Sequence, residues 1–179
     1  LDPGHGGSFR GSIGVNGLTE AAVNLGVALK LRDLLTARGA LVYMTRDSDR
    51  DFLALTDSTL RFDLNERSRL ANAFAPELFV SIHHNADAGG AHDVNETQTY
   101  YKLSDEGPSF ELGADVHRAL ARNVRIGAGR LLPGNFAVLR NSVAPAILTE
   151  SSYLTYPPTE SLLTRADKQQ LEAEAVYLG

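Results

Sequence analysis

Apolar residues recur at helical spacing in several parts of this chain. The first predicted helix covers about residues 19 to 38 and ends before Gly39, which is a typical stop signal. Its inward positions share one face at intervals of three or four residues: Val23, Val27, Leu31 and Leu34. This amphipathic pattern predicts a helix that packs against a core.

Further helices are predicted from their start signals. Asp63-Leu64-Asn65-Glu66 has the pattern of a capping box, and Pro108 suits the first turn of the next helix. The inward stripes of these two helices are Leu64, Ala71 and Phe74, and then Leu112, Val116 and Leu120. Thr159 is expected to cap the last helix, which runs nearly to Gly179.

Short apolar runs between these helices are typical of strands. The run 78–82 is predicted to be a buried strand that ends at His83, while residues 47–62 and 86–95 are polar or glycine-containing and are predicted to be loops. The other strand candidates are residues 41–45, 97–101, 137–139 and 146–149. Strands that alternate with helices indicate an α/β fold.

The composition indicates one globular domain with a substantial core. The chain has 179 residues, of which 43% are hydrophobic and 22% are charged. Its net charge of −5 argues against nucleic-acid binding, which normally needs a clustered basic surface. We expect no membrane span, because the chain has no apolar run of about 18 residues. Cysteine is absent, which excludes disulfides and thiolate metal sites.

The first residues of the chain read as the end of a strand. Leu1-Asp2-Pro3-Gly4-His5 has the pattern of the last strand residue and the turn that follows it. We therefore expect residues 1–179 to be a domain of a longer chain. On this reading, the absence of a signal peptide says little about where the protein works.

Four residues are candidates for chemistry because each follows a strand or begins a helix. His5 lies in a glycine-rich turn after a strand, and Glu20 lies in the first turn of a helix. His83 and Glu150 each end an apolar run, at the carboxyl end of a strand, where α/β sheets place ligands. Each also has a structural interpretation. His5 also fits an incidental position in a glycine turn, the helix dipole by itself stabilises Glu20, and Glu150 also fits a solvated carboxylate at a strand exit.

Together these four residues suit a hydrolytic metal site. Two histidines and one carboxylate form a three-ligand set typical of catalytic zinc, which keeps a fourth position open for water. The same donors also suit other divalent metals. A second carboxylate, Glu150, would accept the proton of the water. Spacing along the chain does not by itself show that the four side chains converge.

Several motifs, in order along nearly the whole chain, resemble the type 3 zinc family of N-acetylmuramoyl-L-alanine amidases. The motifs are Leu1-Asp2-Pro3-Gly4-His5-Gly6-Gly7, Glu20 with Asn24-Leu25, Thr45-Arg46-Asp47, Asn65-Glu66-Arg67 with Ala71-Asn72, Leu78-Phe79-Val80-Ser81-Ile82-His83-His84-Asn85-Ala86, Val138-Leu139-Arg140 and Pro145-Ala146-Ile147-Leu148-Thr149-Glu150. The resemblance implies that His5, Glu20 and His83 bind one zinc ion per chain. It also implies that Glu150 is catalytic.

The same resemblance implies a fold and a substrate. The fold would be a single mixed, mostly parallel sheet of about six strands flanked by helices on both faces. The reaction would be hydrolysis of the amide between the lactyl group of N-acetylmuramic acid and L-alanine in peptidoglycan. Such an enzyme would be an exported autolysin of the periplasm, cell wall or extracellular space, with a role in wall degradation or cell division. We expect a monomer, and leave open a regulatory or wall-anchoring partner.

The chain departs from the family pattern at three places. His84 stands where alanine is usual, Gln98 stands where glutamate is usual, and residues 152–156 replace a Gly-Phe-Leu-Ser-Asn segment. These departures concern the substrate contacts more than the metal ligands. His84 is expected to point away from His83, because neighbouring strand residues face opposite sides.

Two residues are weaker candidates for substrate binding. Arg140 suits bidentate pairing with a carboxylate of the stem peptide, although it also fits a surface position. Asn85 suits either the orientation of a ligand or the capping of a loop. His92 and His117 are expected to be structural or solvated.

The sequence leaves two alternative functions open and allows one expectation about regulation. A zinc carboxypeptidase acting on wall peptides would need a carboxylate clamp, for which Arg140 is the candidate, and a non-catalytic wall-binding module would not need all four site residues. We expect an open groove, because the segment between His83 and Tyr100 is short, contains Gly89-Gly90 and has no apolar stripe. Glu96 is the acid in that region that would be able to lean toward a metal.

Overall fold

Five strands pair into one sheet in residues 1–54 and 56–179, the part of the chain that the computed structural model describes. They are β1 (Asp2–Pro3), β2 (Phe79–Asn85), β3 (Glu96–Lys102), β4 (Gly127–Gly134) and β5 (Ala146–Tyr153). Their order is β1-β2-β5-β3-β4; the β3–β5 pair is antiparallel and the other three pairs are parallel. The predicted mixed, mostly parallel sheet is confirmed, with five strands in place of about six.

The predicted strand at residues 41–45 is not formed. This segment runs beside Leu1, whose amino group donates to the Tyr43 carbonyl at 2.6 Å and whose carbonyl accepts from the Thr45 N–H at 3.0 Å. A ladder needs a row of such partners, and the neighbouring β1 has two residues, of which Pro3 lacks an N–H. Two hydrogen bonds at one residue do not extend the sheet.

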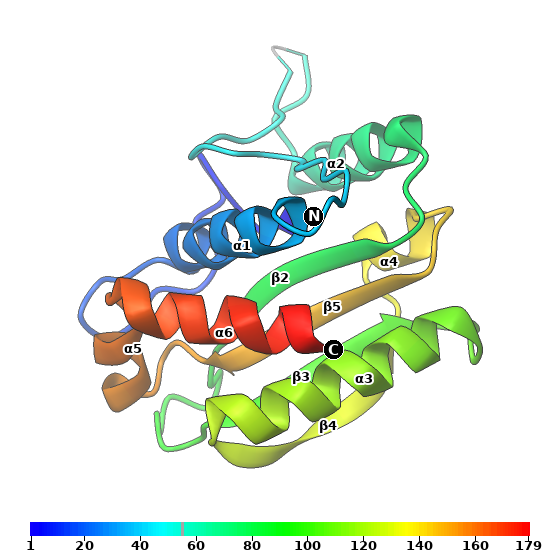
Figure 1. The fold of residues 1–179 in the computed structure, drawn as a ribbon. Helices are drawn as coiled ribbons and strands as arrows, with labels where there is room; N and C mark the ends of the chain where they lie inside the picture. Colours follow the sequence, from blue (N-terminus) through cyan, green and yellow to red (C-terminus); the bar gives the residue numbers. More distant parts are fainter. Residues whose placement is uncertain (55) are drawn as a thin grey trace.

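Helices cover both faces of the sheet (Figure 1). The helices are α1 (Glu20–Thr36), α2 (Leu60–Phe74), α3 (Pro108–Val124), α4 (Ala137–Asn141), α5 (Pro157–Leu163) and α6 (Ala166–Leu178). On one face α1, α3 and α6 enclose a core that includes Val27, Leu31 and Leu120. On the other face α2 and α4 enclose a smaller core with Ala71, Phe79 and Leu139. The apolar stripes of α1 and α3 therefore pack as the sequence predicts.

The start of α2 differs from the prediction. Thr59 caps this helix and its side-chain oxygen accepts from the Phe62 N–H at 3.2 Å, so the helix begins before the supposed capping box. Asp63 instead lies buried inside the first turn, where its carboxylate pairs with Arg67 at 2.7 Å. Aspartate is common both as a helix cap and as a partner in a buried ion pair, so the sequence pattern at Asp63 was assigned to the wrong role.

Two predictions in the second half of the chain were also wrong. Residues 137–139 belong to α4, where the Arg140 N–H donates to the Phe136 carbonyl at 2.8 Å, as in a helical turn. The strand of this region is β4, which the sequence did not indicate. Thr159 lies inside α5, which begins at a pair of prolines, and the predicted last helix is divided into α5 and α6.

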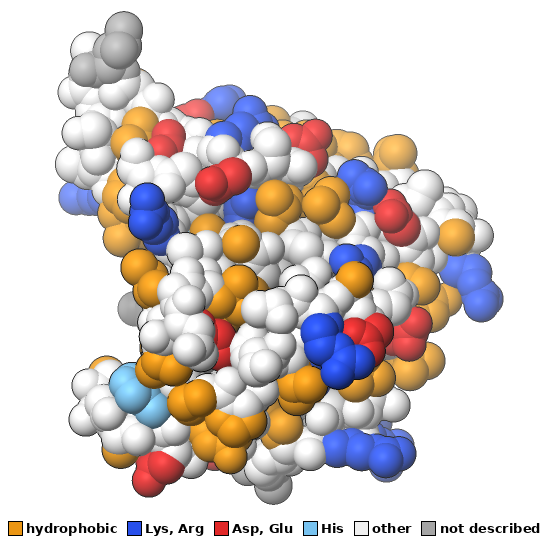
Figure 2. All heavy atoms as spheres, turned by 90° about the vertical axis from the view of Figure 1, so that its left-hand side faces the viewer, with side chains coloured by type: hydrophobic (Ala, Val, Ile, Leu, Met, Phe, Trp, Pro, Cys, Tyr) orange, Lys and Arg blue, Asp and Glu red, His pale blue; other side chains and the backbone are white. Residues whose placement is uncertain are grey.

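Figure 2 shows the side of the molecule that lies at the left of Figure 1. Charged side chains of both signs are interspersed with apolar ones on this face, and its outline is indented between an upper and a lower projection. Among the residues that the structure describes, no helix has both the length and the apolar character that a membrane crossing needs.

Candidate metal centre

The turn after β1 places His5 beside the carboxyl end of β2. His5 has a φ of 62°, and Gly6 and Gly7 also have positive φ, a conformation that glycine adopts at low cost. The Gly4 N–H donates to the Ile82 carbonyl at 3.0 Å, which ties the turn to β2. A β-carbon at Gly4 would lie 2.1 Å from Nε2 of His83, so any other residue here would displace the His83 ring from its position.

Two buried arginines hold this turn in place. Arg46 donates to the carbonyls of Pro3 and Gly4, both at 2.9 Å. Arg67 pairs with Asp2 at 3.0 Å and donates to the His5 carbonyl at 2.6 Å. Both arginines lie in motifs that carry the family resemblance, but the sequence alone did not assign them this role. Their burial and their carbonyl partners define it.

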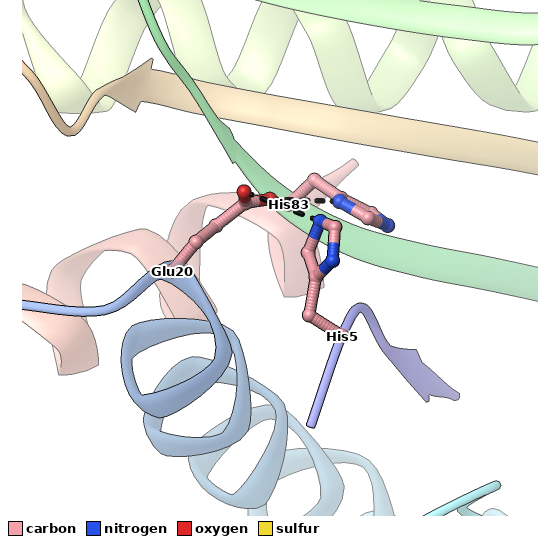
Figure 3. A group of neighbouring side chains, drawn as sticks. All are labelled: His5, Glu20 and His83. Carbon is pink, nitrogen blue, oxygen red and sulfur yellow. Dashed lines mark hydrogen bonds and ion pairs between the residues drawn. The ribbon is translucent and has the colours of Figure 1, made fainter. Parts of the chain in front are cut away.

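Glu20 connects the two histidines (Figure 3). Thr19 caps α1 and so places Glu20 at the first helical position, facing the end of β2. One carboxylate oxygen lies 3.2 Å from Nε2 of His5, and the other lies 2.8 Å from Nδ1 of His83. Burial raises the pKa of Glu20, but the hydrogen bonds and charges of the two histidines outweigh burial and hold that pKa far below its usual range. The group is therefore a carboxylate at neutral pH.

These three side chains have the arrangement of a metal-ligand set. One ligand atom from each of His5, Glu20 and His83 lies within 4.8 Å of the other two. Two donors on one tetrahedral zinc are separated by about 3.3 Å, which a small adjustment of these side chains would give. Two imidazoles and one carboxylate are also the donor types of catalytic zinc sites. The residues present therefore fit a zinc ion.

Glu150 lies beside this set. On the parallel strands β2 and β5, His83 and Glu150 are register partners, so their side chains emerge side by side. Both line a cavity of about 410 Å³ that also includes His5 and Glu20. Oε2 of Glu150 is buried without a hydrogen-bond partner among the described residues. Burial, and then the charge of Glu20, raise the pKa of Glu150 well above its usual value.

Asn85 lines the same cavity but is already engaged. Its side-chain oxygen accepts from the Ala86 N–H at 2.8 Å, and its amide donates to Gln98 at 3.1 Å. Gln98 also accepts from the Tyr100 hydroxyl at 2.7 Å. Asn85 thus has a loop-capping contact while it faces the cavity. Arg140 does not line this cavity but lies on α4 in an adjoining hollow.

The other histidines lie outside the metal-ligand set. Both ring nitrogens of His84 have partners on the far side of β2, Asn24 at 2.8 Å and Glu172 at 2.7 Å. The backbone N–H of His92 donates to Asp87 in the loop after β2, and His117 lies 3.2 Å from the Thr99 hydroxyl on the other face of the sheet.

Glu96 does not lean toward the metal-ligand set. Its carboxylate pairs with Arg130 at 3.1 Å and accepts a hydrogen bond from the Gln98 amide. The segment between β2 and β3 has no helix among the described residues, as its glycines predict. Of the predicted loop 47–62, Leu60 lines the cavity, and it is the first residue of α2.

The fold and the site together define a class of protein. In an α/β fold, a mixed sheet carries a His–Glu–His set at the carboxyl end of its strands, next to the carboxylate of Glu150. This arrangement is typical of hydrolases, and its three ligand types are those that metal-dependent hydrolases use.

A model of the N-acetylmuramoyl-L-alanine amidase family matches residues 1–179. The chain therefore belongs to this family of hydrolases, which confirms the resemblance seen in the sequence.

Relatives with known names support this assignment. The germination-specific N-acetylmuramoyl-L-alanine amidase of Bacillus subtilis is 32% identical over all of this chain and 76% of its own length. The amidase LytC of Bacillus subtilis is 31% identical over all of this chain, but the chain spans only 34% of LytC.

Solved structures agree with the fold. The amidase AmiC2 of Nostoc punctiforme has a TM-score of 0.84 and 31% identity, covering 98% of this chain and 90% of AmiC2. The CwlD amidase of Clostridioides difficile, solved in complex with the GerS lipoprotein, has a TM-score of 0.89 and 29% identity, covering 99% of this chain and 93% of that one.

Proposed function

We propose that residues 1–179 act as a single catalytic domain that uses zinc to hydrolyse the amide between the lactyl group of N-acetylmuramic acid and L-alanine in peptidoglycan. The observation that carries this proposal is the convergence of His5, Glu20 and His83 beside Glu150 in one cavity. Family membership supports the identity of the bond. The products would be intact stem peptides and an uncut glycan.

His5, Glu20 and His83 would hold the zinc ion. When bound there, zinc would polarise the amide carbonyl and lower the pKa of a water molecule. The turn after β1 positions His5, the cap of α1 positions Glu20, and β2 positions His83, all before substrate arrives. The buried arginines Arg46 and Arg67 support that orientation through backbone carbonyls.

Glu150 would move the proton. Its unpartnered Oε2 accepts a proton from the attacking water and then delivers it to the departing alanine amine. Burial, and then the charge of Glu20, raise the pKa of Glu150 above its usual value. A raised pKa favours the second step, in which the protonated carboxyl delivers its proton to the amine. Asn85 and Arg140 would contact the substrate from the cavity and from the hollow next to it.

The place of action follows from the substrate. We propose that the protein is exported and works in the periplasm, the cell wall or the extracellular space, as an autolysin that takes part in wall degradation or cell division. We also propose that the domain works as a monomer. A partner remains part of the proposal, because the CwlD relative is solved with a lipoprotein.

The decisive experiment is digestion of purified peptidoglycan with mass analysis of the products. An amidase releases stem peptides with a free alanine amine and leaves the sugars joined. Release of single amino acids from a peptide terminus would instead show a carboxypeptidase. Binding without release would show a wall-binding module.

The zinc proposal has its own measurement. Elemental analysis of protein purified without chelator should find one zinc per chain, because the site offers three ligands from protein. An enzyme that is active without metal would contradict the proposal.

A further inference from the structure

A second hollow continues the metal-site cavity outward between α2 and α4. We call it the α2–α4 hollow; its volume is about 460 Å³, and Arg61 and Asn65 on α2 and Arg140 and Asn141 on α4 line it. It shares Leu60, Leu64 and Ala137 with the cavity of the metal-ligand set. A substrate at Glu150 would thus be able to extend into this hollow without leaving the protein surface.

The α2–α4 hollow is positively charged. Arg61 and Arg140 are both exposed, and none of its lining residues is acidic. The acids of the same stretch of α2 have other partners, since Asp63 pairs with Arg67 and Glu66 pairs with Arg69. Two arginines are therefore present without a carboxylate from the hollow itself to balance them.

Hydrogen bonds tie together α2 and α4, the two helices that carry these arginines. The Asn72 side chain of α2 donates to the Asn141 carbonyl of α4 at 2.8 Å and accepts from the Val143 N–H at 3.1 Å. Arg140 uses one terminal nitrogen to donate to the carbonyl and the side-chain oxygen of Asn135, both at 3.0 Å. This contact orients its guanidinium at the rim of the hollow.

We propose that the α2–α4 hollow binds a carboxylate of the stem peptide, and that the peptide side of the substrate therefore lies between α2 and α4. Arginine pairs with carboxylates through two parallel hydrogen bonds, whereas the N-acetylated sugars of the glycan offer no such anion at the repeating units. The shared apolar residues Leu60 and Leu64 would cover the short peptide segment between the scissile amide and this carboxylate. The inference rests on the proposed function and adds the direction of the substrate and the role of Arg61.

The test compares two synthetic muramoyl peptides that differ at one group. One carries a free α-carboxyl on the second stem residue, and the other carries a carboxamide there. Binding of each is measured by calorimetry on the zinc-loaded Glu150→Gln variant, so that the result does not depend on cleavage. The free carboxyl is expected to bind about tenfold more tightly, as one exposed charge-assisted contact allows.

Substitutions in the hollow should abolish that preference. Arg61→Gln and Arg140→Gln, each in the Glu150→Gln background, should bind the two peptides with nearly equal affinity. Arg69→Gln is the matched control, because Arg69 is exposed on α2 but lies outside the hollow, and it should keep the tenfold preference.

The outcomes separate the two proposals. Equal binding of both peptides to the Glu150→Gln protein, or a preference that survives in the Arg61→Gln and Arg140→Gln proteins, would overturn the carboxylate site. If the preference depends on both arginines but the parent enzyme does not cleave the amide, the proposed function fails while the binding site stands.

Discussion

His83 and His84 are neighbours on β2, yet they face different environments. The His83 side chain is 16% exposed and lies in the cavity with Glu20 and Glu150. The His84 side chain is fully buried on the opposite face of β2, between α1 and α6. This opposition follows from the alternation of side chains along a strand.

The two histidines differ in which of their nitrogens have partners. Asn24 and Glu172 take both ring nitrogens of His84, so none remains for a metal or a substrate. Within the part of the chain that the structure describes, the His83 ring has one hydrogen-bond partner, Glu20, which is itself a proposed ligand. Residue type therefore does not identify a metal ligand. A ligand is identified by the face of the strand on which it lies and by its neighbours on that face.

The two sides of β2 meet at Glu20. The backbone N–H of His84 donates to Glu20 at 3.3 Å, and Asn24, which contacts the His84 ring, donates to the same oxygen at 3.4 Å. Groups on the buried face of β2 thus position the Glu20 carboxylate, which is part of the metal-ligand set on the cavity face. Substitutions on each side should separate metal chemistry from stability.

The largest expected effect is at His83. His83→Ala should remove both the zinc and all measurable activity, because two ligands do not retain catalytic zinc well. His84→Ala should still contain one zinc per chain, as should His92→Ala and His117→Ala. Elemental analysis of the four proteins is the measurement. Zinc loss in His84→Ala but not in His83→Ala would show that the wrong neighbour is assigned as the ligand.

Glu150→Gln should reduce turnover by about 100- to 10,000-fold, because glutamine keeps the size of the side chain but cannot accept a proton. Zinc content and thermal midpoint should stay near those of the parent, since Oε2 of Glu150 has no hydrogen-bond partner to lose among the described residues. Kinetics and calorimetry on the same preparation check both points. Activity within a few-fold of the parent would place the base elsewhere.

His84→Ala should lower the free energy of unfolding by about 3 kcal/mol, because it leaves the buried Glu172 carboxylate without its main partner. The double variant His84→Ala/Glu172→Leu should recover much of this loss, since it removes the buried charge as well. Denaturant unfolding of the three proteins is the measurement. If His84→Ala left the free energy of unfolding unchanged, Lys168 and Ser152 would be sufficient to stabilise the Glu172 carboxylate.

The smallest expected effect is on the loss of stability at acid pH, through the buried carboxylate of Glu172. Burial raises the pKa of Glu172, but the charge and hydrogen bond of His84, aided by Lys168, outweigh it and hold that pKa below its usual 4.5. A lowered pKa in the folded state contributes stability above the unfolded pKa, and this contribution is lost as the pH falls through the folded pKa. Between pH 7 and acid pH, Glu172→Gln should therefore lose less stability than the parent. Equal slopes in the two unfolding curves would contradict this.

Several elements were predictable because their signal is local. The stripes of α1 and α3 repeat at helical spacing, and β2 and β5 each begin with a short apolar run that leads to a site residue, His83 or Glu150. The strands themselves continue past these residues, so the predicted strand end at His83 was two residues short. By contrast, β4 contains three glycines and a proline, a composition that local propensity assigns to a turn. It forms a strand because β3 offers it a parallel edge. The short helix α4 shows the reverse error: its apolar residues predict a strand, but the segment forms a helix.

The sequence by itself determined which residues are chemically suited to the site. The histidines, the two glutamates and the glycines of the first turn stand in recognisable motifs, and their types restrict the chemistry to metal-assisted hydrolysis or simple metal binding. Tertiary structure alone decided their partners. Arg67 reaches the His5 carbonyl across 62 positions, and His84 meets Glu172 across 88. Such pairings depend on how the sheet and helices pack, because spacing along a chain carries no information about contacts between distant segments.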